Sequence, residues 1–88
     1  MIREKTRRTR KSKVVPRTIG RHLVVDPEVC HGELTFRGTR VPVRTVLLCL
    51  ARGRSLDYLR KSWPEVSPEA IEEAVSLAAD MLVHRFRN

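Results

Sequence analysis

The sequence predicts a mainly α-helical protein, in which a basic N-terminal arm and a short β-hairpin precede a three-helix, helix-turn-helix bundle. Three observations lead to this fold class. Basic residues crowd the start of the chain, apolar residues recur at spacings of three and four from residue 43 onward, and Gly, Ser and Pro mark the expected helix ends. We therefore divide the chain into a disordered arm at 1–21, a helix-turn-helix domain at 22–84 and a C-terminal tail at 85–88.

The N-terminal arm supplies the whole formal excess of positive charge. Residues 1–21 hold nine basic side chains and one acidic one, a net of +8, which equals the net charge of the 88-residue chain. Such a block of like charge cannot collapse on itself, and we expect it to be disordered when free. Its cations would bind nucleic acid by releasing counterions, or else the arm is only a solvated leader. The candidates for nucleic-acid binding in the arm are Arg7, Arg8, Arg10, Lys11 and Lys13.

A short β-hairpin is predicted at the start of the domain. The apolar run Leu23–Val25 predicts a strand that Asp26 and Pro27 close, because Asp favours turns and Pro removes a backbone donor from the ladder. The segment Glu33–Arg37 alternates weakly and ends at Gly38, so it can pair with the first strand.

The first predicted helix begins at Val43 and ends at Gly53. Its apolar stripe consists of Val43, Val46, Leu47, Leu50 and Ala51. Leu48 and Cys49 fall outside this stripe, so either the hairpin or another chain must cover them. Because a body of about 67 residues is small enough to gain from a partner, we expect a homodimer.

The second and third predicted helices each begin with a capping serine. Ser55 can cap the second helix, which should turn Leu56, Leu59 and Trp63 inward and end at Pro64. Ser67 can cap the third helix, with Pro68 in its first turn. The buried face of the third helix is predicted to contain Ile71, Ala74, Val75, Ala78 and Leu82.

Helix-turn-helix proteins usually insert the last helix of the motif into the major groove, but the third helix of this chain is acidic. Glu69, Glu72, Glu73 and Asp80 are expected on its outward face, where they would repel phosphates. Better candidates for nucleic-acid binding are the basic residues at helix ends and in the neighbouring turns. They are Arg37, Arg40, Arg44, Arg52, Arg54, Arg60 and Lys61.

The sequence does not favour an enzyme, a metal site or a membrane protein. Adjacent Cys30 and His31 in an extended segment would point to opposite faces, so they do not suggest a thiol nucleophile with its base. The His and Cys residues have no recognised chelating spacing, and we expect no metal or cofactor. The longest apolar run, Val46–Ala51, is far too short to span a bilayer. Without a disulfide framework, a soluble, cytoplasmic protein is expected.

The motifs from His22 to Met81 resemble the family catalogued as domain of unknown function 433, often described as antitoxins of the VapB type. The most specific piece is Arg37-Gly38-Thr39-Arg40-Val41-Pro42-Val43, supported at the expected separations by Asp26-Pro27, Cys30-x-Gly32, Gly53-x-Ser55, Pro64 and Ser67-Pro68-Glu69-x-Ile71. The chain departs from the family pattern at Leu34, where Pro is common. The basic arm is not part of that pattern.

This resemblance implies a homeodomain-like or winged helix-turn-helix fold. It also implies a gene that often lies beside one for a PIN-like ribonuclease toxin. Members of the family are thought to bind and silence that toxin and to repress their shared operon. The partners implied are therefore DNA and the ribonuclease.

The Arg-Gly-Thr-Arg turn has two interpretations. Gly38 permits a positive φ or a close approach to a partner, while Arg37 and Arg40 offer planar donors suited to phosphate or carboxylate. Alternatively, Arg40 pairs with Asp26 or with a helix carboxylate and fixes the hairpin to the body.

The C-terminal residues suggest how a PIN-like nuclease could be bound. Such an enzyme would hold clustered carboxylates around a divalent metal, and an inhibitor would need a cation to occupy that place. Arg85 and Arg87 could supply the charge and Phe86 an apolar anchor. The alternative is a frayed terminus whose arginines complement the helix dipole.

The leading hypothesis is a cytoplasmic, dimeric, DNA-binding antitoxin without enzymatic activity that neutralises a PIN-like ribonuclease. One alternative is a DNA- or RNA-binding regulator without a toxin partner. Another is a protein-interaction module that docks a basic partner on the acidic third helix. The first hypothesis needs a toxin, the second only nucleic acid, and the third neither.

Overall fold

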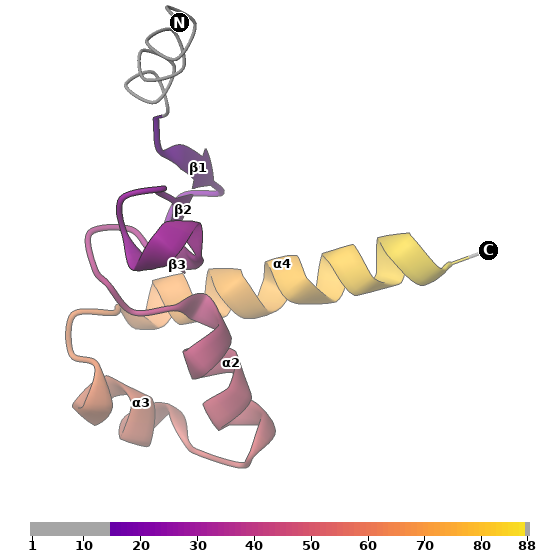
Figure 1. The fold of residues 1–88 in the computed structure, drawn as a ribbon. Helices are drawn as coiled ribbons and strands as arrows, with labels where there is room; N and C mark the ends of the chain where they lie inside the picture. Colours follow the sequence, from indigo (N-terminus) through magenta and orange to yellow (C-terminus); the bar gives the residue numbers. More distant parts are fainter. Residues whose placement is uncertain (1–14, 88) are drawn as a thin grey trace, which may run out of the picture.

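The computed structural model describes residues 15–87, and within them the fold is mainly helical, as predicted (Figure 1). In this part of the chain three strands and a 3-10 turn precede three α-helices. The elements are β1 (Arg17–Ile19), β2 (Leu23–Val25), η1 (Cys30–Gly32), β3 (Leu34–Phe36), α2 (Val43–Ala51), α3 (Leu56–Ser62) and α4 (Pro68–Phe86).

The strands form an antiparallel sheet in the order β1-β2-β3, where the sequence predicted only the hairpin of β2 and β3. Leu23 pairs with Ile19 on one side and with Phe36 on the other. Gly20 takes a φ of +62°, which lets β1 fold back on β2. The predicted boundary of the arm at residue 21 is therefore wrong, because residues 17–19 belong to the sheet.

Helix α2 begins and ends where the sequence indicated. Pro42 precedes it with an extended backbone, and Gly53 follows it with a φ of +88° while donating its N–H to the Leu50 carbonyl. Cys49 is half-buried and packs against the core, so the body of the chain covers it. Leu48 remains exposed.

The serine caps of α3 and α4 are confirmed. The Ser55 hydroxyl accepts the N–H of Tyr58 at 3.1 Å, and the Ser67 hydroxyl accepts the N–H of Ala70 at 3.1 Å. Leu59 is fully buried, whereas Leu56 is exposed and its predicted inward position is wrong. Helix α3 contacts the core through the buried Leu59. The half-buried Trp63, which the sequence also placed inward, packs on the core directly after the helix ends at Ser62.

One hydrophobic core joins the sheet to all three helices. Its buried members are Leu23, Phe36, Val41, Val43, Val46, Leu59, Val66, Ala70, Ile71 and Ala74. The residues that α4 contributes come from its first two turns. The packing therefore fixes α3 and the start of α4 against α2 and β3.

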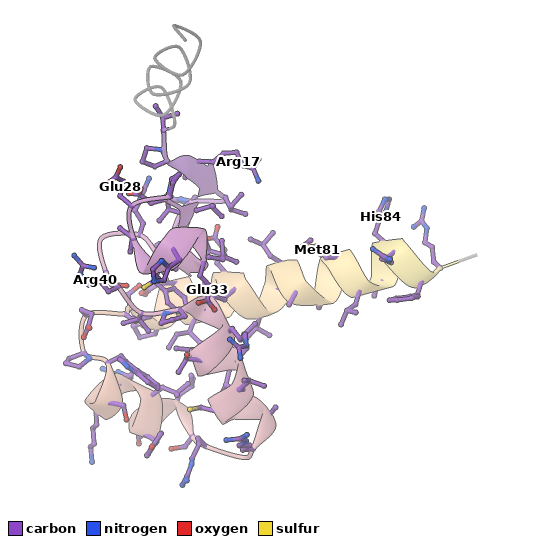
Figure 2. All side chains as sticks on the ribbon, in the orientation of Figure 1. Arg17, Glu28, Glu33, Arg40, Met81 and His84 are labelled. Carbon is purple, nitrogen blue, oxygen red and sulfur yellow. The ribbon has the colours of Figure 1, made fainter. Side chains whose placement is uncertain are left out.

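The second half of α4 extends beyond the other elements (Figure 1). Figure 2 shows Met81 and His84 on this projecting part. The predicted buried face holds for Ile71 and Ala74 but fails further along, because Val75 is 42% exposed and Leu82 is 61% exposed. A helix of 19 residues is about 28 Å long, which exceeds the length that the small body can cover.

Thr35 is the one fully buried polar residue of the described core, and its hydroxyl has no hydrogen-bond partner there. A buried hydroxyl without a partner costs stability. We predict that Thr35→Val raises the free energy of unfolding by about 1 kcal/mol, which raises Tm by roughly 4–8 °C in a domain of this size.

The control for this change is Thr35→Ser, which keeps the hydroxyl and removes the methyl group. It should lower stability by about 1 kcal/mol, since it leaves a small cavity. Thermal unfolding followed by circular dichroism measures both variants. A Tm of Thr35→Val below that of the wild type would show that the hydroxyl is satisfied.

Candidate nucleic-acid interface

The structure places the candidate binding residues of the body on the surface. Arg37, Arg40, Arg44 and Arg54 are all exposed, and they lie in turns or at the start of α2. The arm candidates Arg7, Arg8, Arg10, Lys11 and Lys13 lie outside the described residues. The geometry below therefore concerns the body alone.

Thr39 organises the Arg-Gly-Thr-Arg turn. Its hydroxyl donates to the Phe36 carbonyl at 2.8 Å and accepts the Val41 N–H at 3.0 Å. The backbone N–H of Thr39 also donates to the Phe36 carbonyl, and the Phe36 N–H donates to the Val41 carbonyl. Gly38 has a φ of +82°, as the sequence indicated. The sequence interpretation missed Thr39, although threonine hydroxyls commonly bond local backbone in turns.

The Arg40 side chain extends away from this turn (Figure 2). Within residues 15–87 the salt bridges join His22 to Glu73 and Arg44 to Glu33, so Arg40 is not paired with Asp26 or with a helix carboxylate. The Asp26 carboxylate instead accepts the N–H of Glu28 at 2.9 Å. The backbone carbonyl of Arg40 accepts the thiol of Cys30 at 3.3 Å, which leaves the guanidinium accessible to a partner.

Arg44 is exposed in the first turn of α2. Its guanidinium lies 3.5 Å from the Glu33 carboxylate, and both side chains are accessible to solvent. Exposed ion pairs of this kind contribute little to stability. Because a phosphate can compete with Glu33 for the guanidinium, the pair does not remove Arg44 from the candidate set.

Exposed basic residues lie in the turn between α2 and α3 and in the last turn of α3. The Arg54 guanidinium lies over the Tyr58 ring, 4.8 Å from its centre, as in a cation–π contact. Tyr58 was not among the sequence candidates. We define the α2–α3 surface as Arg52, Arg54, Tyr58, Arg60 and Lys61, all of which are exposed.

This surface borders an open pocket of about 650 Å³ between α3 and the start of α4. Its lining residues are Asp57, Arg60, Lys61, Pro64, Val66, Ser67 and Pro68. Asp57 is the one acidic residue of α3. Planar guanidinium groups beside an exposed aromatic ring can contact phosphates and stack on bases.

The sequence placed Glu73 on the outward face of α4 with the other carboxylates, and this prediction is wrong. Its carboxylate accepts the backbone N–H groups of Arg21 and His22, each at 2.8 Å, and lies 3.0 Å from the His22 ring nitrogen Nδ1. A Cβ atom on Gly20 would lie only 2.6 Å from the nearer Glu73 oxygen. Glu73 therefore holds the β1–β2 turn on α4, and Gly20 makes room for it.

The C-terminal candidates Arg85, Phe86 and Arg87 are exposed at the end of the projecting part of α4. The Arg85 guanidinium lies 5.7 Å from the centre of the Phe86 ring. The helix continues through Phe86, so the predicted start of a tail at residue 85 is wrong. Arg85 and Phe86 are both compatible with a helix, so nothing in their side chains ends α4 before them.

Cys30 and His31 lie in η1 and not in an extended segment. Their φ values of +49° and +57° place both in the left-handed region. The described residues contain no group of three or more His, Cys, Asp or Glu side chains that could hold a metal ion. No described helix is long and apolar enough to cross a membrane.

Comparison with known proteins identifies the family to which this fold belongs. The profile of the family described as "Protein of unknown function (DUF433)" matches residues 23–78. The chain belongs to the DUF433 family. The DUF433 match includes the Thr39 turn, the α2–α3 surface and Glu73, whereas β1 and the end of α4 lie outside it.

The chain is also similar to "Uncharacterized protein y4eO" of Sinorhizobium fredii (strain NBRC 101917 / NGR234). The two are 38% identical over 48 residues, which are 54% of this chain and 22% of y4eO. The chain therefore spans less than a quarter of that relative. No solved structure matches the present chain significantly.

The pH dependence of stability tests the role of Glu73 in this DUF433 protein. Hydrogen bonds from the Arg21 backbone, and then from the His22 backbone and ring, hold the pKa of Glu73 below its ordinary value of 4.5, against the partial burial that raises it. A carboxylate whose pKa is lowered by folding stabilises the fold above its ordinary pKa. That contribution is lost as the pH falls through the lowered value.

We predict that Glu73→Gln has a lower Tm than the wild type at neutral pH and loses less stability on acidification. Thermal melts from about pH 7 to about pH 3 would measure both effects. Asp80→Asn is the matched control, because Asp80 is an exposed carboxylate on the same helix, and it should keep the wild-type profile. If Glu73→Gln lost stability on acidification as steeply as the wild type, the stabilising role assigned to the Glu73 carboxylate would be wrong.

Proposed function

We propose that this DUF433 protein is a DNA-binding antitoxin that represses its own operon and neutralises a PIN-like ribonuclease. The observation that carries the DNA-binding part is the α2–α3 surface. Arg54 and Tyr58 lie together there at the tight turn between two helices, among further exposed cations. Helix-turn-helix proteins contact DNA through such a pair of helices and the turn between them.

In this proposal α3, and not α4, approaches the DNA. Helix α3 holds one acidic residue, Asp57, whereas α4 exposes Glu69 and Glu72 in its first two turns. Carboxylates beside phosphates would repel them. The packing of Leu59 on the core leaves the opposite side of α3 open to solvent.

The neighbouring turns and the arm would add contacts to the phosphate backbone. Arg37, Arg40 and Arg44 are exposed, and the Arg40 guanidinium has no carboxylate partner in the described body. If about five cations of the arm reach phosphates, they alone would contribute a log-log salt slope near −4.5. The arm would therefore raise the affinity for DNA of any sequence. The contacts of the body would fix the position of the protein along the DNA.

The antitoxin part of the proposal rests on the family resemblance and on the C-terminal cations. Arg85, Phe86 and Arg87 are exposed together, so a carboxylate-rich site could bind the two guanidinium groups. A regulator without a toxin would use the same DNA surface. Binding of a toxin therefore distinguishes the two functions, whereas binding of DNA does not.

Salt-dependent DNA binding tests the α2–α3 surface. We predict that Arg54→Ala weakens binding to duplexes from the upstream region of its own gene by about 1–3 kcal/mol and reduces the salt slope by about one. Fluorescence anisotropy at several salt concentrations measures both. Removing residues 1–14, which leaves β1 intact, should weaken binding to all duplexes alike and flatten the slope further.

Arg17→Ala is the matched control for Arg54→Ala. Arg17 is an exposed arginine on β1, and Figure 2 shows it pointing in a different direction from Arg40. Its loss should change affinity by less than about 0.5 kcal/mol. Equal effects of Arg17→Ala and Arg54→Ala would contradict a specific role for the α2–α3 surface.

Co-expression tests the antitoxin role. We predict that the product of the adjacent open reading frame arrests growth when it is expressed alone, and that this chain forms a complex with it and restores growth. Arg85→Ala combined with Arg87→Ala should weaken that rescue. Normal growth with the adjacent gene alone, and no complex, would favour the DNA-binding regulator without a toxin.

A further inference from the structure

Helix α4 carries an apolar stripe that the body does not cover. Val75, Ala79, Leu82 and Phe86 follow one another at spacings of four, three and four residues, which places them on one face of the helix. Val75 is 42%, Leu82 61% and Phe86 72% exposed, and Ala79 is exposed as well. We call these four residues the α4 seam.

The α4 seam is distinct from the face of α4 that enters the core. The core face contains Ala70, Ile71 and Ala74, all buried. At 100° per residue, the centre of the seam lies roughly 100° around the helix from the centre of that face. Most of the seam lies on the part of α4 that projects from the body (Figure 1). A contiguous exposed apolar surface of this kind marks an interaction site.

We propose that the α4 seam pairs with the α4 seam of a second copy of this chain, with the two helices antiparallel. The spacing is self-complementary in that orientation, because reversing the series four, three, four gives the same series. Val75 then lies opposite Phe86 of the second copy, and Ala79 lies opposite Leu82. Each small side chain meets a large one, which permits close packing.

The charges on α4 favour the antiparallel orientation. Glu72 is exposed near the start of the helix, and Arg85 and Arg87 are exposed near its end. A parallel pair would place like charges side by side. In the antiparallel pair, Glu72 of one copy comes to within about 3 Å, measured along the axis, of the level of Arg87 of the other, and both lie on the same flank of the seam, whereas Arg85 lies on the opposite flank. Long side chains can bridge this offset.

In this pairing the two-fold axis lies away from the bodies of the two copies. The two-fold axis passes between the levels of residues 80 and 81, which lie on the projecting part of α4 (Figure 2, Met81). Each body therefore lies near the far end of the other copy's helix. Ala78 and Val83, which flank the seam, are uncharged. Such an isologous contact closes with two copies.

This inference does not depend on the proposed function, since the protein alone forms the contact. Because the seam uses Phe86, a copy that is paired through it does not offer that residue to a toxin. It also differs from the dimer expected from Leu48 and Cys49, because it uses another helix. With only two heptads per helix the interface is small, and we expect a dissociation constant in roughly the micromolar range.

Sedimentation equilibrium of the full chain tests the seam with two neighbouring substitutions. Leu82→Glu places a charge in the seam and should raise the dimer dissociation constant by about 100-fold or more. Met81→Glu is the matched control, because Met81 is 69% exposed on the same projecting turn but lies about 100° away around the helix. It should change the constant by less than about threefold.

Charge reversal tests the orientation. Glu72→Arg should weaken the dimer about tenfold, and adding Arg87→Glu to the same chain should restore it. Circular dichroism verifies that each variant keeps its helix content. A monomeric wild type at millimolar concentration, an equal response of the two Glu substitutions, or a failure of the double variant to recover would each overturn the proposal. If the wild type is monomeric by itself and co-sediments with the product of the adjacent open reading frame, the seam belongs to that partner and not to a second copy.

Discussion

The β1–β2 turn is held on helix α4 by its contact with Glu73, while Leu23 and Phe36 of the sheet enter the core. One carboxylate binds the backbone of Arg21 and His22, which lie more than fifty residues earlier in the sequence. Hydrogen bonds to an ionised acceptor are among the strongest that a surface can offer. Through this contact the β1–β2 turn, and with it β1, is held on α4. Gly20 is constrained twice over, by its positive φ and by the carboxylate beside it.

The sheet in turn sets where the cationic side chains lie. The Arg37 N–H donates to the His22 carbonyl at 2.7 Å, so the Thr39 turn begins beside the residue that Glu73 holds. Thr39 then closes the turn on Phe36, whose side chain is buried in the core. A chain of local contacts thus connects α4 to the guanidinium of Arg40. The rigidity of this turn limits the directions in which Arg37 and Arg40 can point.

The features that the sequence predicted are those with local causes. Ser55 and Ser67 cap their helices through bonds three residues away, and Gly53 ends α2 through its own φ, so neighbouring residues suffice to predict them. Strand β1 was missed because its partner, β2, and the Glu73 contact are needed to see why Arg17–Ile19 is a strand. The exposure of Leu82 was missed because periodicity identifies an apolar face without showing what covers it.

The two ends of α4 behave differently because the body is shorter than the helix. Its first turns exchange apolar contacts with α2 and bind the β1–β2 turn. Its last turns carry large apolar side chains that nothing in the described chain covers. If the α2–α3 surface binds DNA and the α4 seams pair, the dimer would carry two α2–α3 surfaces related by one two-fold axis. A protein with that symmetry reads an inverted repeat, since each half-site meets one copy of the surface.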